Sequence, residues 1–243
     1  MLHLLFAISL LLAGTATWAQ DPDSDQDAKA IQGMLGDILS QGNKANEAEL
    51  PSTYDFDYKL TMEFWEEGKD RQSMTMMWSK DRNITGMLTE DDLMVFDNNQ
   101  DIIVQFDQKK MEANILPNIM KGMGQYLKPE MEEEMEILSV QKTGNKKEIL
   151  GYTCEEILVE TEDDKSQAWV TYDLNTSMQD VLGNSMDIQI ENYIDEKFAD
   201  EFKDAMAMYT EATDKKNGEV QYSEVIEIVE GYQIDNSKYK VQR

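Results

Sequence analysis

The chain has 243 residues, of which 41% are hydrophobic, and 49 acidic against 22 basic side chains give a formal net charge of −27. This hydrophobic content is sufficient for a packed core, which excludes global disorder. The strong negative charge repels phosphate backbones, so we exclude nucleic acid as a partner.

Residues 1–19 have the features of a signal peptide. An apolar run from Leu4 to Leu12 is followed by small residues at Thr17 and Ala19, which suit cleavage before Gln20. The run is shorter than the roughly 20 residues of a membrane-spanning helix, and no later segment is long and apolar enough to span a bilayer. A buried N-terminal helix of a cytosolic protein is the alternative. We therefore predict an exported protein with no transmembrane segment.

Residues 20–52 are expected to form an acidic N-terminal segment. Alternating carboxylates from Asp21 to Asp27 suggest a calcium loop, but the glycine and the final glutamate of such a loop are missing. A solvated terminus is the favoured interpretation, and calcium binding stays open. Apolar residues from Ile31 to Leu39 then recur at helical spacing, which predicts a short amphipathic helix.

From Tyr54 the pattern changes to strict alternation, and apolar side chains at every second position up to Phe64 predict a half-buried strand. Turn residues separate the short apolar runs that follow. Further strands are predicted near 74–78, 84–88, 93–96, 102–106, 110–113, 137–141, 148–160, 168–174 and 219–229. Strands this short and evenly spaced predict an antiparallel meander, because parallel pairing needs longer crossovers.

Two more helices are expected within the strand series. One is predicted to open at Pro117 and to carry Leu116, Met120 and Met123, and a longer one is predicted from the apolar stripe between Met186 and Tyr209. A curved sheet wrapped around such helices buries the apolar faces of both. We therefore predict an α+β fold with one domain at residues 53–243, a curved antiparallel sheet (half-barrel) covered by amphipathic helices.

Few residues offer catalytic chemistry. The only histidine, His3, lies in residues 1–19, so the exported chain has no imidazole for a Ser-His-Asp mechanism or a catalytic zinc site. Cys154 is the only cysteine, which excludes an internal disulfide, and a buried small hydrophobe is favoured over a reactive thiol. No catalytic residue, metal site or cofactor is predicted, and a non-enzymatic function is favoured.

Methionine is unusually frequent, with 17 residues. Three interpretations are open: plain core filling, an adaptable lining for a lipid-like ligand, and capture of a soft metal by thioethers. Core filling is the commonest use of methionine, and the ligand lining is the functional hypothesis. The predicted lining consists of Met62, Met74, Met76, Trp78, Ile102 and Val104 from the sheet, with Met120 and Met123 from a helix.

Three local sequences carry a family resemblance. They are ILGYTCEE at Ile149–Glu156, AWVT at Ala168–Thr171 and IDNSKY at Ile234–Tyr239. Together with the strand Tyr54–Met62 they resemble a secreted bacterial family, domain of unknown function 4412. The resemblance spans roughly Tyr54 to Tyr239, and it implies the periplasm or secretion in a Gram-negative bacterium.

The order of strands and helices is also similar to the lipoprotein-carrier (LolA/LolB-like) half-barrel, which implies an apolar cavity. The arginine-bearing strand of such carriers has no counterpart beside Trp78, where Lys80 and Arg82 follow instead. Two functions therefore remain open. The first is a non-catalytic protein that binds a hydrophobic or lipidic ligand in the cell envelope. The alternative is an acidic envelope or extracellular interaction protein with a solid core, whose surface meets a partner protein.

Overall fold

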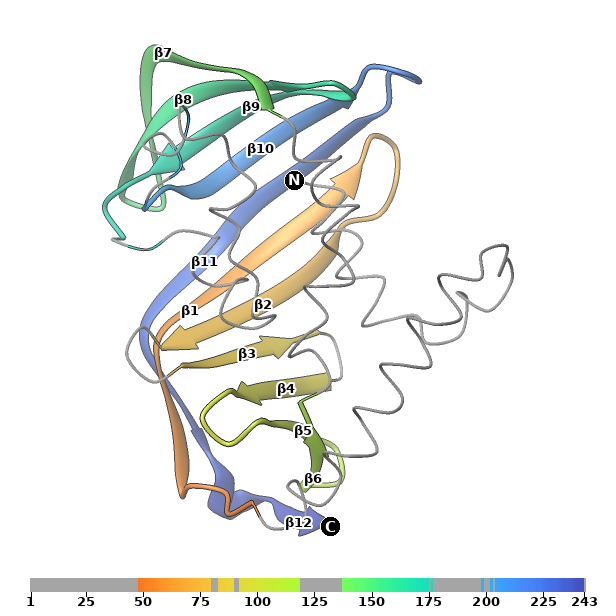
Figure 1. Cartoon of the computed structure of the whole chain (residues 1–243), viewed down its shortest axis with the longest axis vertical. Helices are drawn as coiled ribbons and strands as arrows, with labels where there is room; N and C mark the ends of the chain where they lie inside the picture. The colour runs from red at the N-terminus through yellow and green to blue at the C-terminus, as the bar shows by residue number, and fades with distance from the viewer. Residues whose placement is uncertain are drawn as a thin grey trace.

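The computed structural model describes residues 48–79, 83–89, 92–118, 137–174 and 204–242, together with residues 176, 198 and 202. They form one open, curved sheet of 12 strands (Figure 1). The elements are β1 (Thr53–Glu66), β2 (Gln72–Ser79), β3 (Ile84–Leu88), β4 (Asp92–Asp97), β5 (Ile102–Asp107), β6 (Glu112–Pro117), β7 (Ile137–Ile149), β8 (Tyr152–Thr161), β9 (Asp164–Thr171), β10 (Met206–Asp214), β11 (Val220–Asp235), the 3-10 helix η4 (Asn236–Lys238) and β12 (Lys240–Gln242).

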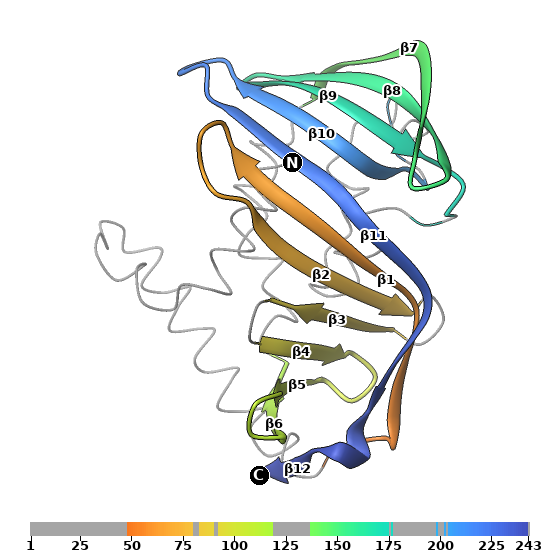
Figure 2. The ribbon, with the colours of Figure 1, turned by 180° about the vertical axis from the view of Figure 1, so that it is seen from behind.

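The order across the sheet is β12-β6-β5-β4-β3-β2-β1-β11-β10-β9-β8-β7. The long strands β1 and β11 lie at the centre, with β2 to β6 on one side and β7 to β10 on the other, as the view from behind also shows (Figure 2). Consecutive strands from β1 to β6 and from β7 to β9 pair antiparallel, so the meander prediction is confirmed for them. β12 is different, because it pairs with β6 in parallel.

The predicted α+β class is wrong. The described residues lie almost entirely in strands, and η4 is the only helical element with both ends among them. Leu116 and Pro117, expected to open a helix, instead end β6 and pair with Ile103 and Ile102. The helix predicted at 31–39 and most of the other two predicted helices lie outside the described residues; of the longest one, Phe198 and Phe202 are described singly and are helical. In the part of the chain that the structure describes, no helix is long and apolar enough to cross a membrane.

The C-terminal end of the predicted long helix is also a strand, β10. Met206, Met208, Thr210 and Ala212 are buried and the residues between them are half-buried, which is the period of two of a strand. β10 pairs with β9 on one side and with β11 on the other, so its backbone groups find partners along both edges. The helical spacing of Phe202, Met206 and Tyr209 is therefore a coincidence of the apolar pattern.

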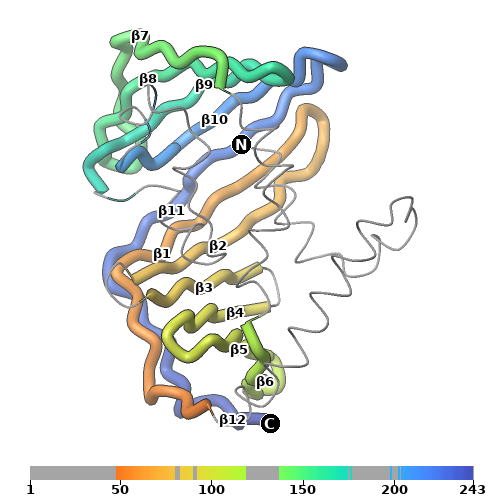
Figure 3. The backbone as a smooth tube through the Cα atoms, in the orientation of Figure 1, coloured from red at the N-terminus to blue at the C-terminus, as the bar shows by residue number. Residues whose placement is uncertain are grey.

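A bend at the centre of the sheet shapes the whole fold. β1 pairs with β2 only from Tyr58 to Phe64, whereas it pairs with β11 along its full length. The register of β1 and β11 shifts between Thr61 and Met62. Gly231 of β11 has a φ of +69°, which is costly for any residue with a Cβ. Toward η4 and β12 the two strands bend together (Figure 3).

The bend produces a packed layer behind β3 to β6, which we call the reverse core. Tyr54, Phe56 and Ile234 from the bent ends pack there against buried side chains of β2 to β6. These are Met77, Ile84, Leu93, Val95, Ile102, Val104, Phe106 and Ala113. Gly86 makes the close approach possible, because a Cβ there would meet Met77 Cε at 2.9 Å and Phe56 Cζ at 3.3 Å.

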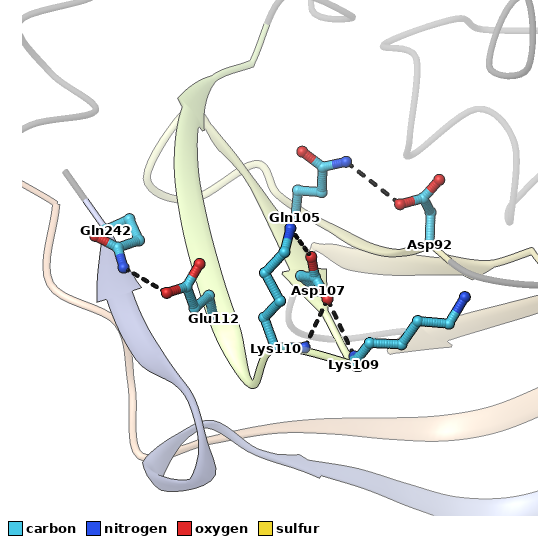
Figure 4. Close-up of polar contacts among 7 residues, drawn as sticks. All are labelled: Asp92, Gln105, Asp107, Lys109, Lys110, Glu112 and Gln242. Carbon is cyan, nitrogen blue, oxygen red and sulfur yellow. Dashed lines mark hydrogen bonds and ion pairs between the residues drawn. The ribbon is translucent and has the colours of Figure 1, made fainter.

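Polar contacts stabilise the β5–β6 turn and the pairing of β6 with β12 (Figure 4). In the β5–β6 turn, the Asp107 carboxylate accepts hydrogen bonds from the backbone N–H of Lys109 at 3.1 Å and of Lys110 at 2.8 Å. The Lys110 ammonium also donates to Asp107 at 2.8 Å, which is the main reason why the pKa of Asp107 lies below its ordinary value. The Gln242 amide donates to Glu112 at 2.9 Å and thereby ties β12 to β6.

Candidate functional site

The opposite side of β1 to β4 carries a row of methionine side chains, which we call the methionine face. It comprises Met62, Met74, Met76, Trp78, Met87 and Met94. Alternation along each strand places these side chains on one side, and register aligns them across strands. Met62 on β1 is the cross-strand partner of Met74 on β2. A second series runs from Met76 on β2 to its partner Met87 on β3 and from there to Met94 on β4.

A second row on the same face is mainly aromatic and includes two buried polar atoms. Tyr58, Trp78, Thr85, Phe96 and Ile103 face one another in turn across β1 to β5. The ring of Tyr58 stacks on Trp78, with 5.3 Å between centroids and 24° between the planes. Trp78 is 1% exposed and Thr85 is 3% exposed. Within the described part of the chain, neither the Trp78 Nε1 nor the Thr85 Oγ1 has a hydrogen-bond partner.

The far half of the sheet also contributes to this cluster. Met206 and Met208 of β10, Cys154 of β8 and Val225 of β11 belong to the same set of buried apolar side chains, and Tyr152 packs against it. Burial raises the pKa of the Tyr152 phenol, and the nearby Glu230 carboxylate adds to the shift. The described members of this buried cluster are uncharged, so it is suited to apolar and neutral groups.

Cys154 has the buried environment that the sequence favoured. Its side chain is fully buried, and burial raises the pKa of the thiol above the ordinary value. A thiol with a raised pKa is less ionised at neutral pH, and the thiolate is the nucleophilic form. Cys154 therefore serves as a small apolar residue of the cluster.

The structure places the described members of the predicted lining on two different sides of the sheet. Met62, Met74, Met76 and Trp78 lie together on the methionine face. Ile102 and Val104 are equally buried but lie in the reverse core, because Ile103 is the β5 residue whose side chain points to the methionine face. Met120 and Met123 lie outside the described residues.

Sequence reasoning missed three residues of this face: Thr85, Met87 and Met94. A signal for the two methionines was present, because the turn at residues 89–92 joins two apolar runs. A hairpin around that turn pairs Leu88 with Leu93 and therefore Met87 with Met94. Thr85 gave no signal, since a threonine in a strand is common and its partner on β2 depends on register.

Cations also lie over aromatic rings of the sheet. Lys147 lies over the rings of Trp169 at 4.2 Å and Tyr209 at 4.9 Å, and Arg71 lies over Trp65 at 3.9 Å. Such contacts cover aromatic rings with partly solvated cations. Among the residues that the structure describes, no group of three or more His, Cys, Asp or Glu side chains could hold a metal ion. The methionine face is therefore the candidate site.

No family model matches the chain, and no curated protein matches it. The resemblance to domain of unknown function 4412 therefore stays a prediction. Among solved structures, an uncharacterized conserved protein from Thermus thermophilus is similar at 7% identity, with 81% of this chain and 86% of that chain covered and a TM-score of 0.35. A LolA superfamily protein from Nitrosomonas europaea is similar at 11% identity, with 79% and 92% covered and a TM-score of 0.24.

PNGF-II is also similar, at 13% identity and a TM-score of 0.34, with 79% of this chain covered. This chain spans only 30% of the length of that protein. At TM-scores this low, the three likenesses carry no argument about what the present chain does.

Proposed function

We propose that this chain is a non-catalytic, exported protein that binds a hydrophobic or lipidic ligand against the methionine face, in the cell envelope of a Gram-negative bacterium. The observation that carries the proposal is the in-register row formed by Met76, Met87 and Met94, extended by the pair of Met62 and Met74. The signal-peptide pattern of residues 1–19 supports export.

The chemistry of methionine supports an adaptable lining. Its side chain is unbranched and its thioether is polarizable, so neighbouring methionines repack around irregular apolar shapes at low cost. An acyl chain placed against such a row gains about 25 cal/mol for each Å² of apolar surface removed from water. Branched or aromatic side chains, which dominate the reverse core, are stiffer and favour one fixed arrangement.

Charge narrows the class of ligand. A net charge of −27 repels anionic head groups, and the side chains that make up the methionine face are apolar. The proposed ligand is therefore neutral or zwitterionic, with at least one long apolar chain.

A second candidate is the interaction protein with a solid core. Met62, Met74, Met76 and Met87 are between 1% and 5% exposed, as they are in a fully packed interior. In that case the methionines only fill space, and the acidic surface meets a partner protein. The two candidates differ in whether a small apolar molecule co-purifies with the chain.

Native mass spectrometry separates them. The full chain is exported to a bacterial periplasm, purified without detergent, and measured before and after organic extraction. A mass excess that disappears on extraction, with lipid in the extract, is the expected result. A bare polypeptide mass that does not change after incubation with lipid vesicles would support the solid core instead.

A matched pair of variants tests the location. Met76→Trp adds bulk on the methionine face, whereas Leu158→Trp adds the same indole at a residue that is 39% exposed on β8. We expect less lipid with Met76→Trp and an unchanged amount with Leu158→Trp, provided that circular dichroism shows both variants folded. Equal lipid content in both folded variants would place the ligand away from this face.

A further inference from the structure

Two neighbouring residues of the methionine-bearing side each carry a buried polar atom. Trp78 on β2 and Thr85 on β3 are direct cross-strand partners, so their side chains project from the same side of the sheet. The indole of Trp78 stacks on the ring of Tyr58, and its N–H has no partner among the described residues. The Thr85 hydroxyl has none there either.

Comparable polar side chains elsewhere in the described sheet have partners. Thr75, three residues before Trp78 on β2 and on the reverse side, shares a hydrogen bond of 2.9 Å with the Thr61 hydroxyl. The Glu156 carboxylate accepts from Thr143 at 2.5 Å and from Asn145 at 2.6 Å. Buried polar groups left without a partner cost free energy and call for a specific explanation. Among the buried polar atoms without a partner in the described ranges, those of Trp78 and Thr85 belong to residues that face each other across strands.

From this pairing we infer that the Trp78 indole and the Thr85 hydroxyl together bind an acyl carbonyl oxygen of the ligand. An indole N–H can only donate, so the ligand must present an acceptor, and the threonine hydroxyl supplies a second donor to it. A neutral ester or amide carbonyl fits the uncharged surroundings, whereas an ionised carboxylate would be buried without a counter-charge. This inference rests on the proposed function and assigns to it a polar recognition point.

The test compares two lipids that differ in one group. Monooleoylglycerol carries an ester carbonyl, and oleyl glyceryl ether has the same chain and head group without it. Both are supplied from cyclodextrin to the full, delipidated chain, and their dissociation constants are measured by native mass spectrometry. We expect the wild type to bind the ester about tenfold more tightly, which corresponds to one or two hydrogen bonds to a neutral acceptor.

Three variants locate the effect. Trp78→Phe keeps a ring for the stack with Tyr58 but removes the N–H, and Thr85→Val keeps the shape but removes the hydroxyl. Each is expected to reduce the ester preference about threefold or more, while binding of the ether stays unchanged. Thr75→Val removes a hydroxyl from the reverse side of β2 and is expected to keep the full preference.

The outcomes distinguish this inference from the function on which it rests. Equal binding of ester and ether by the wild type would overturn the carbonyl-binding pair and leave the apolar binding function intact. Retention of the preference in both Trp78→Phe and Thr85→Val would overturn it as well. Binding of neither lipid would overturn the proposed function and the inference together.

Discussion

The two faces of β2 to β5 are both buried, but they differ in what fills them. The reverse core contains mainly branched and aromatic side chains, and a buried polar pair lies at its edge. Tyr54 donates to Asp97 at 3.3 Å, and the Asp97 carboxylate also accepts from the Gln100 amide at 2.9 Å. The methionine face contains flexible side chains and two polar atoms without partners in the described structure.

This difference separates a layer built for stability from one suited to an exchangeable partner. Stiff, shape-specific packing gives a single arrangement and high stability, whereas methionine-rich surfaces tolerate repacking. The two layers share the same strands, so substitutions on one strand can compare them directly.

The largest effect is expected in the reverse core, with Phe106→Ala. Phe106 is fully buried and its ring meets Tyr239 edge to face at 4.7 Å, so truncation is expected to lower the free energy of unfolding by about 3–5 kcal/mol. Met76→Ala on the methionine face is expected to cost less, about 2–3 kcal/mol, because neighbouring methionines collapse into the space. Urea denaturation measures both, and a larger loss for Met76→Ala would reverse the comparison.

A matched pair of substitutions by leucine compares the packing of the reverse core with that of the methionine face. Val95 is fully buried opposite Gly86 and Val104, so Val95→Leu overpacks the reverse core and is expected to cost about 2 kcal/mol. Met87 is also buried, but Met87→Leu nearly conserves volume and is expected to cost under about 1 kcal/mol. Urea denaturation of the two variants should show the difference, and equal costs would indicate that both layers are equally stiff.

The same two layers show how far the sequence predicts this fold. Alternation from Tyr54 to Phe64 predicted β1, and the apolar run at Ile84–Leu88 predicted β3 with the bounds that the structure has. These strands were predictable because each has residues of clear polarity and flanking turn residues. The side toward which β5 presents its residues was not predictable, because Ile102, Ile103 and Val104 are all buried and give no alternation.

Long-range contacts decide where the other residues lie. Ile102 and Val104 pack in the reverse core, where the bend of β1 and β11 brings Phe56 against the same side of the sheet. The apolar pattern around Met206 fits a helix and a strand equally well. The segment forms a strand because it pairs with β9 on one side and β11 on the other. Neither the bend nor these neighbours can be seen in a local window of sequence.

A smaller effect, with a distinct pH dependence, is expected from the hydrogen bond inside the reverse core. Burial raises the pKa of the Tyr54 phenol well above its ordinary value, and the Asp97 carboxylate adds to the shift. Folded Tyr54 therefore keeps its proton above pH 10, where an unfolded tyrosine ionises. Its contribution to stability is complete below about pH 10 and decreases by about 1.4 kcal/mol for each pH unit above it.

Tyr54→Phe removes this contribution and the hydrogen bond. At neutral pH the variant is expected to lose about 1 kcal/mol. Above pH 10 its free energy of unfolding should fall less steeply with pH than that of the wild type, because Tyr54 no longer ionises in the unfolded chain. Urea denaturation between pH 7 and pH 11 provides the test, and parallel curves across this range would mean that Tyr54 is not protected from ionisation.

The smallest effect is expected where the methionine face carries a hydroxyl without a partner. In the ligand-free protein, Thr85→Val removes a buried group that makes no hydrogen bond with the described residues, so the free energy of unfolding is expected to stay within about 0.5 kcal/mol or to rise. Thr75→Val, one strand away and on the reverse side, breaks the bond to Thr61 and is expected to cost about 1 kcal/mol. Denaturant titration of delipidated protein compares the pair. An equal loss in both variants would mean that the Thr85 hydroxyl has a partner without ligand, and the two faces would then be equally satisfied.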